Sequence, residues 1–451
     1  MPSIDRRSGG PDVNHQNRAP AVDTRTVCAK LVSTVKTGGL KEVIALSIDK
    51  PVTIGRNPAA CSFVIPDAVV SSVHCKLYAV HSSTGGIIVS CQDFSTNGLI
   101  LNGHRVRRTS VILMDGDIIQ IPSSKTFQCV HIWKEPREKN TIFDPTPPTH
   151  PSHKVRIGNY VVTSHCLGTG GFATVHLAMD KVASRQVACK TIGLKKDAER
   201  ETVMKEVKIL LAMDHPNISK ILDVEEDGKF LYVHIFLELC TGGDLFTYIS
   251  SHKLKSGRLC EGEAKYIMYQ IFKGLKYLHD KMISHRDLKP ENVLLYTPGP
   301  YPRIQIADFG LARPKAYEKT FTACGTVMYL PPEGILALHD KRLGYVAMPL
   351  DCWSAGVIIG AHPFDRGPAD PEQSEISTRS EQIIKDRIVH GDVDFAHEIW
   401  GGMGHAKALV SRLLIHSHEH RATVGAALQS YWIACDAEEL ERAYAERVLA
   451  G

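Results

Sequence analysis

Two patterns of hydrophobic and polar positions divide the chain. Between about residues 26 and 133, short runs alternate between apolar and polar positions, as at Ile44, Leu46 and Ile48. This period of two, interrupted by turn residues, predicts the antiparallel strands of a β-sandwich. Beyond residue 155, apolar positions also recur at helical spacing, most clearly between Gly262 and Lys281, which predicts a long buried helix.

Three stretches lack the pattern of a packed core. Residues 1–25 are polar and aperiodic, which predicts a disordered tail. Residues 134–154 are rich in proline, which predicts a semi-rigid linker. Residues 434–451 are expected to form a C-terminal tail with one short amphipathic helix. The packed bodies are therefore expected at residues 26–133 and 155–433.

Length and charge narrow the class of protein. The chain has 451 residues, enough for two or three domains, and its formal net charge of +4 is small and spread along the sequence. We therefore expect no direct binding to nucleic acid and none to a membrane. A secretory signal and an apolar run long enough to span a bilayer are both missing, so a soluble intracellular protein is expected. The twelve cysteines include no Cys-x-x-Cys pair and are expected to be reduced core residues.

Three short motifs follow one another within the predicted sandwich. They are Gly55-Arg56, then Ser71 with His74 three residues later, then the sequence Ser-Thr-Asn-Gly at residues 95–98. Each motif alone also fits a strand-end turn or a hairpin. In this order and spacing they resemble the core of the forkhead-associated (FHA) domain. That resemblance implies an all-β sandwich that binds phosphothreonine peptides through the loops at one end.

The residue types of these motifs suit a phosphate ligand. A guanidinium binds two phosphate oxygens, and short hydroxyl and amide groups approach them closely. The resemblance implies that Arg56, Ser71 and Ser72 bind the phosphate, and that Thr96 and Asn97 hold the peptide backbone. A phosphothreonine-containing protein is thus the expected partner. The FHA family often has Arg or Asn where this chain has Ser72, so the affinity stays open.

The second body carries three motifs in a fixed order. Residues 285–292 read His-Arg-Asp-Leu-Lys-Pro-Glu-Asn, residues 308–310 read Asp-Phe-Gly, and residues 331–333 read Pro-Pro-Glu. They resemble the catalytic loop, the magnesium-binding triplet and the Ala-Pro-Glu triplet of serine/threonine protein kinases. The resemblance implies a bilobal α+β kinase fold over residues 155–433. The protein is therefore expected to be multidomain, with the FHA sandwich followed by the kinase.

The same resemblance implies ATP and Mg²⁺ as cofactors. Asp287 would accept the proton of the attacking Ser or Thr hydroxyl, and Lys289 would neutralise charge on the transferring phosphoryl group. Asn292 and Asp308 would hold the magnesium ions. A lysine two residues after the catalytic aspartate is typical of serine/threonine kinases rather than tyrosine kinases.

Further motifs imply a nucleotide site. Residues 167–175 resemble the glycine-rich turn that covers ATP phosphates, with Ala173 in place of its third glycine, although a plain hairpin is the alternative. Lys190 would bridge the phosphates and pair with Glu206 on the next helix. Leu237 would guard the pocket behind the adenine. The residues implied to bind ATP are Leu167, Gly168, Thr169, Gly170, Gly171, Val175, Lys190, Glu206, Glu238, Cys240 and Asp244.

Arg286 implies regulation by phosphorylation. An arginine directly before the catalytic aspartate needs an anion, commonly a phosphate on the activation loop, for which Thr320 and Thr322 are the candidates. Phosphorylation of one copy by another implies a transient homodimer. The acidic residues Asp244 and Glu291 would favour protein Ser/Thr substrates with an upstream arginine.

The chain departs from the kinase pattern after Gly356. The sequence from Asp351 to Gly356 resembles the start of the helix that supports the catalytic loop, but about five residues of that helix are then missing, roughly one and a half turns. An altered gene model, a splice form and a genuine variant all fit. A non-catalytic phosphopeptide-binding adaptor with an impaired kinase fold is therefore the alternative function.

The combination of domains resembles one family. A single FHA domain before a kinase of the calcium/calmodulin-kinase-like group resembles the checkpoint kinases. It is most similar to their fungal meiosis-specific branch, because residues 1–25 hold no Ser-Gln or Thr-Gln cluster. The resemblance implies DNA damage or meiotic checkpoint signalling in the nucleus, or otherwise in the cytoplasm.

Overall fold

The computed structural model describes most of both predicted bodies. The described residues are 27–34, 41–48, 50–82, 85–132, 155–170, 173–194, 197–226, 232–253, 259–309, 313–314, 319–320, 326–340, 342–360, 377–391, 393, 395 and 400–450. The predicted tail 1–25 and the predicted linker 134–154 lie outside them.

The N-terminal body is a sandwich of two sheets. Their strand orders are β2-β1-β11-β10-β7-β8 and β4-β3-β5-β6-β9. The alternating residues face inward as predicted, so that Leu31, Leu46, Leu77 and Phe127 are almost fully buried in one core. The strands are β1 (Val27–Ser33), β2 (Val43–Ser47), β3 (Val52–Gly55), β4 (Phe63–Val64), β5 (Cys75–His81), β6 (Ile87–Asp93), β7 (Leu99–Leu101), β8 (His104–Val106), β9 (Ser110–Ile112), β10 (Ile118–Gln120) and β11 (Thr126–His131).

The second body begins with an antiparallel sheet of order β12-β13-β14-β15-β17-β16. It carries helix α1 (Asp197–Leu211), and Val207 of α1 packs on Val233 and Ile235 of the sheet. The strands are β12 (Val155–Ile157), β13 (Tyr160–Thr169), β14 (Ala173–Asp180), β15 (Arg185–Gly193), β16 (Ile221–Glu226) and β17 (Tyr232–Leu237). This arrangement of a small sheet with one helix is the smaller lobe of the predicted bilobal fold.

The larger lobe is built around the predicted buried helix, α3 (Glu261–Asp280). Its apolar residues Ile267, Ile271, Leu275 and Leu278 are almost fully buried in the largest core. The surrounding helices are α2 (Leu245–Lys253), α4 (Pro332–His339), α5 (Ala347–Gly360), α6 (Ser377–His390), α7 (Gly404–Leu413), α8 (Val424–Leu428), α9 (Tyr431–Ala434) and α10 (Ala437–Tyr444). Short strand pairs β18 (Ile283–Ser284) with β21 (Arg313–Pro314), β19 (Val293–Leu295) with β20 (Ile304–Ile306), and β22 (Lys319–Thr320) with β23 (Tyr345–Val346) lie between them.

The last helix completes this core. In α10 and the π-helical turn after it (Ala445–Leu449), Leu440, Tyr444 and Val448 are buried against α3. The Tyr444 hydroxyl donates to Asn217 Oδ1 at 2.7 Å. The C-terminal residues are therefore part of the larger lobe.

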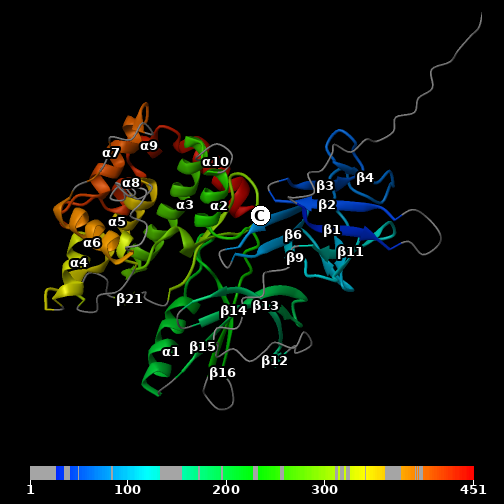
Figure 1. The fold of residues 1–451 in the computed structure, drawn as a ribbon, viewed down its shortest axis with the longest axis horizontal. Helices are drawn as coiled ribbons and strands as arrows, with labels where there is room; N and C mark the ends of the chain where they lie inside the picture. The colour runs from blue at the N-terminus through cyan, green and yellow to red at the C-terminus, as the bar shows by residue number, and fades with distance from the viewer. Residues whose placement is uncertain are drawn as a thin grey trace, which may run out of the picture.

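The sandwich lies beside both lobes of the second body (Figure 1). It contacts the smaller lobe through β9 and Gln186 of β15, and the larger lobe through β5 and α2. No helix in the described ranges is long and apolar enough to cross a membrane.

Candidate active site

One buried carboxylate holds the predicted catalytic loop in place. Asp351 of α5 is fully buried and accepts hydrogen bonds from the backbone N–H groups of His285 and Arg286, each at 2.9 Å. Arg286 has a φ of 70°, a left-handed conformation that strains a non-glycine residue by about 1–3 kcal/mol. Ser284 Oγ and His279 Nε2 also lie 2.9 Å from Asp351 Oδ2. Burial acts to raise the pKa of Asp351, but the hydrogen bonds from His279 and the Arg286 backbone, with the charges of His279 and His285, together lower it.

The predicted catalytic residues meet at Asp287. Lys289 Nζ lies 2.9 Å from Asp287 Oδ2, and Asn292 Nδ2 donates to the same oxygen at 3.1 Å. On the other side, the backbone N–H of Thr326 donates to Asp287 Oδ1 at 2.9 Å, and Lys289 also donates to Thr326 Oγ1 at 2.8 Å. The residues 285–292 and Thr326 thus form one hydrogen-bonded group in which Asp287 is the acceptor.

Asp308 and Lys190 also come together across the two lobes. Lys190 Nζ lies 2.5 Å from Asp308 Oδ1. Burial acts to raise the pKa of Asp308, but Lys190, together with the charges of His285 and Lys289, lowers that pKa. The amide nitrogen of Asn292 is used by Asp287, so its oxygen faces elsewhere. Asp308 and Asn292 therefore offer hard oxygen donors of the kind that Mg²⁺ prefers, and they fit that ion.

The predicted nucleotide-binding residues of the smaller lobe share one face of its sheet. Val175 pairs with Lys190 across β14 and β15, and Ala188 lies two residues before Lys190. Leu167, at the end of β13, belongs to the same apolar cluster as Val175 and Ala188. Gly168, Thr169 and Gly170 follow Leu167, whereas Gly171 and the side chain of Glu206 lie outside the described residues.

The segment between the lobes carries Glu238, Cys240 and Asp244. The carboxylate of Glu238 accepts from Gln305 Nε2 at 2.6 Å, so this side chain faces away from the sheet face of Lys190. Asp244 is 3 % exposed, and its carboxylate accepts from the backbone N–H of Thr247 at 2.8 Å at the start of α2. In the described structure Asp244 therefore caps α2.

The predicted regulatory residues lie partly within the described structure. Arg286 is buried and donates to the Tyr345 hydroxyl at 3.0 Å. In the backbone pairing of β22 with β23, Thr320 lies opposite Tyr345. Thr320 thus lies on the strand next to Tyr345, the residue that Arg286 contacts. Thr322 lies outside the described residues.

The three FHA motifs gather at one end of the sandwich. The Arg56 side chain is exposed, and its Nε donates to Val70 O at 3.2 Å. Ser71 Oγ accepts from the backbone N–H of Thr96 at 3.2 Å, which joins the second and third motifs. Ser72, Thr96 and Asn97 are exposed beside them. These loops therefore present a guanidinium, hydroxyl groups and an amide at one surface.

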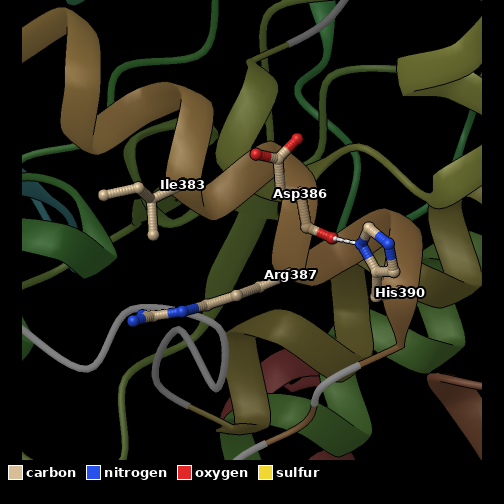
Figure 2. Close-up of a pocket in the computed structure, with 4 residues that line it drawn as sticks. All are labelled: Ile383, Asp386, Arg387 and His390. Atoms are coloured by element: carbon tan, nitrogen blue, oxygen red, sulfur yellow. Dashed lines mark hydrogen bonds between the residues drawn. The ribbon is translucent and has the colours of Figure 1, made fainter.

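Two further features of the second body are a buried ion pair and a pocket. Arg421 is buried and binds Glu333 with two hydrogen bonds, of 2.7 and 3.0 Å. A pocket of about 240 Å³ lies along α6 and is lined by Ile383, Asp386, Arg387 and His390 (Figure 2). None of the predicted catalytic or nucleotide-binding residues lines it.

Sequence reasoning missed His279 and the contacts of the sandwich with the kinase. His279 lies in the last turn of α3, in a stretch that its apolar spacing marked only as a core helix. Its role becomes visible only when α5 brings Asp351 to it. The sandwich contacts had a signal in the consecutive apolar residues Val111, Ile112, Leu113 and Met114, which do not alternate.

Comparison with known proteins agrees with the fold and the site. The family described as "Protein kinase domain" matches residues 161–433, and the family described as "FHA domain" matches residues 52–122. The chain therefore belongs to the protein kinase family, as one of its members that carry an FHA domain before the kinase domain.

Three relatives match most of the length of this chain. The chain is 32% identical to the meiosis-specific serine/threonine-protein kinase mek1 of Schizosaccharomyces pombe, over 88% of this chain and 84% of the relative. It is 30% identical to MEK1 of Saccharomyces cerevisiae, over 92% and 87%. It is 31% identical to the probable serine/threonine-protein kinase fhkC of Dictyostelium discoideum, over 87% of this chain but only 63% of that longer relative.

Proposed function

We propose that this protein is an ATP-dependent serine/threonine protein kinase in DNA damage or meiotic checkpoint signalling, recruited to its targets by phosphothreonine binding. The observation that carries the proposal is the group around Asp287, in which Lys289, Asn292 and Thr326 all donate hydrogen bonds to the Asp287 carboxylate and so position it to accept a proton. A decayed enzyme has little reason to keep all four residues in hydrogen-bonding contact.

Each residue of this group has a role in the proposed reaction. The Asp287 carboxylate accepts the proton of the substrate hydroxyl and orients its oxygen toward the phosphorus. Lys289, already bound to Asp287, places a positive charge where the phosphoryl group is transferred. Lys190 positions the nucleotide phosphates from the smaller lobe. Mg²⁺, held by Asn292 and Asp308, would supply charge neutralisation on those phosphates.

The adenosine part of ATP would lie between the lobes. We propose that Leu167, Gly168, Thr169, Gly170, Gly171 and Val175 cover it from above, and that the backbone of Glu238 and Cys240 binds the adenine edge. Asp244 would have to leave its cap of α2, or share it, in order to bind the ribose. Glu206 would pair with Lys190 in the active arrangement.

Recruitment would use the FHA loops. Arg56 would bind the phosphate with Ser71 and Ser72, and Thr96 and Asn97 would hold the peptide backbone. The exposure of Arg56 and the hydrogen bond between Ser71 and Thr96 support this proposal. The domain that carries these loops would comprise residues 26–133, and the kinase residues 155–433.

The pathway, location and activation are proposed from the relatives and from Arg286. Two relatives are named meiosis-specific kinases, which supports a meiotic checkpoint role in the nucleus. Substrates would be proteins with an arginine upstream of the Ser or Thr. Two copies brought together in a transient homodimer would phosphorylate each other at Thr320 or Thr322, and Arg286 would bind the new phosphate.

The first experiment measures phosphate transfer from magnesium-ATP to an arginine-rich Ser/Thr peptide. We expect Asp287→Asn to reduce kcat by at least about 10²-fold, since a positioned general base contributes that much. Asp280→Asn is the matched control, because Asp280 is an exposed aspartate whose ion pair within the described residues is with Lys276 along α3. Transfer that survives in Asp287→Asn would refute the assignment of Asp287.

A second experiment tests the phosphopeptide site. Arg56→Ala should weaken binding of a phosphothreonine peptide at least tenfold. Lys50→Ala should leave this binding unchanged, because Lys50 is an exposed basic residue that precedes the start of β3, whereas Arg56 follows its end. Fluorescence anisotropy of a labelled peptide measures both. Equal binding by Arg56→Ala and the native chain would remove Arg56 from the site.

The alternative is a non-catalytic adaptor that binds phosphopeptides. Its support is the sequence after Gly356, where about five residues of the family's helix are missing. If phosphopeptide binding is normal and the well-folded chain, phosphorylated on Thr322, transfers no phosphate, the adaptor becomes the better description.

A further inference from the structure

The FHA sandwich presents an apolar face to the kinase. In β6 and β9 the residues that fill the sandwich core alternate with residues that point out of it. Val111 belongs to the sandwich core, whereas Ile88 and Ile112 belong to a separate cluster that includes kinase residues. Val80 and Met114 pack against that same cluster. We call Val80, Ile88, Ile112 and Met114 the docking face.

The docking face packs on the sheet face that carries the predicted nucleotide site. Its kinase partners are Leu177, Ala188 and Leu239, with Leu167 and Val175 packed against them. In the sheet Leu177 lies opposite Ala188, and Val175 lies opposite Lys190. The sandwich thus shares one apolar cluster with the residues proposed to contact the adenine. Ile112 is 1 % exposed as a result.

Polar contacts tie the sandwich to both sides of the cleft. The backbone N–H of Ile112 donates to Gln186 Oε1 at 2.7 Å, and Gln186 Nε2 donates back to Ile112 O at 2.8 Å. The Gln186 amide therefore caps the free edge of the sandwich sheet, since β9 is its last strand. Thr241 Oγ1, within the segment between the lobes, donates to Ser110 Oγ at 2.8 Å.

We propose that the docked FHA domain is a brake on the kinase, which acts by covering the apolar mouth of the nucleotide cleft and by fixing the two lobes relative to each other. Kinases must close their lobes on ATP and open them to release ADP. A domain bonded to Gln186 on one side of the cleft and to Thr241 on the other restrains that motion. This proposal rests on the proposed kinase function of the same cleft.

The contact has a feature expected of one that must open. Ser90, between Ile88 and the phosphopeptide end of β6, is fully buried on the docking side, and its Oγ has no hydrogen-bond partner within the described residues. Such a stranded hydroxyl costs about 1–3 kcal/mol, and undocking would return it to water. Domain contacts within one chain are commonly reversible when they combine modest apolar area with few polar bonds.

On β5, Val80 of the docking face lies at the far end from the phosphopeptide loops, whereas Ile112 pairs with Ser90 in the middle of β6. β5 runs from Cys75, next to His74 of the second FHA motif, to His81 beside α2. Its seven residues span about 20 Å. A phosphorylated partner could therefore bind Arg56 and Ser71 while the brake is still engaged. Recruitment and release are thus separate steps in this arrangement.

The test compares a buried and an exposed isoleucine of the sandwich, each substituted in the full chain. Ile112→Asp places a charge in the docking face, whereas Ile118→Asp changes an isoleucine of β10 that is 45 % exposed. Gln186→Glu weakens the contact from the kinase side and leaves every residue of the sandwich unchanged. Binding of a fluorescent ATP analogue is measured by titration, and binding of a phosphothreonine peptide reports that the sandwich is folded.

We expect Ile112→Asp and Gln186→Glu to tighten nucleotide binding, by at least tenfold for Ile112→Asp. The reason is that apparent affinity rises with the fraction of open molecules. Ile118→Asp should have no effect. The proposal is overturned if either docking variant binds the nucleotide no more tightly than the native chain, or if Ile118→Asp gains as much.

The phosphate-transfer assay distinguishes this proposal from the kinase function itself. Tighter nucleotide binding without transfer would retain the docked sandwich as a cover of the nucleotide cleft and refute the kinase function. Transfer with unchanged nucleotide affinity would retain the kinase and refute the brake.

Discussion

Replacing Asp351 by Asn tests the claim that one buried carboxylate supports the catalytic loop. The two oxygens of Asp351 accept from His279, Ser284 and the backbone N–H groups of His285 and Arg286. Asn keeps the shape but offers one oxygen and one NH₂ group. Whichever way the amide turns, at least one of the two backbone N–H groups then faces a donor.

The size of the effect follows from those contacts. A buried N–H without an acceptor costs about 1–3 kcal/mol, and hydrogen bonds to a charged acceptor are each worth about 1.5–3 kcal/mol. Since Asp351 is fully buried, water cannot replace the lost acceptor. We therefore expect a loss of about 3–5 kcal/mol in the free energy of unfolding of the larger lobe, comparable to breaking a buried ion pair. The left-handed Arg286 would also lose the bond that offsets its strain.

Urea unfolding followed by tryptophan fluorescence measures this loss. Three of the four tryptophans, Trp353, Trp400 and Trp432, lie in the larger lobe, so the signal reports that lobe. The control is again Asp280→Asn, which removes an exposed pair worth at most about 0.5 kcal/mol. A loss below about 1 kcal/mol in Asp351→Asn would refute the argument that this carboxylate holds the loop.

Three further predictions concern the same lobe. Burial is the largest cause that lowers the pKa of His215 from 6.5 to about 4, so the folded state excludes a proton that the unfolded chain takes up, and the melting temperature should fall as the pH drops from 6.5 to about 4. His215→Asn, which can still accept from the Asn217 N–H, should make that fall less steep. An unchanged slope would contradict the assignment to His215. Tyr444→Phe should cost about 1–2 kcal/mol of unfolding free energy in the urea assay because it strands Asn217 Oδ1, and no loss would mean that this hydrogen bond does not stabilise the lobe. Gly356→Ala would place a methyl group 2.9 Å from Leu413 Cβ and should cost about 1–3 kcal/mol, so a neutral result would show that α5 and α7 can separate.

The sequence predicted most of the fold because its signals were local. Alternation at Leu46 and Leu77 reports one buried strand face, and the helical spacing of Ile271 and Leu275 reports one buried helix face. The grouping of Asp287, Lys289 and Asn292 follows from their closeness in sequence, since a loop of eight residues leaves them little freedom to separate.

The rest depended on contacts between elements far apart in the chain. Ser110 and Thr241 are 131 positions apart, and the sequence around one gives no sign that it contacts the other. The consecutive apolar residues from Val111 to Met114 do contain the information that both faces of this segment are covered. They do not say whether the cover is a partner, a second copy or the kinase of the same chain.

The strand β6 also sets a limit on how the protein can be divided. Its residues Ile88, Val89, Ser90 and Cys91 are all buried, which means that both faces of the strand are covered in the full chain. A fragment cut in the linker at 134–154 would expose Ile88 and Ile112 to water as a continuous apolar strip. Such a strip favours self-association. The isolated sandwich should therefore be less soluble than the full chain, and Ile112→Asp should restore its solubility.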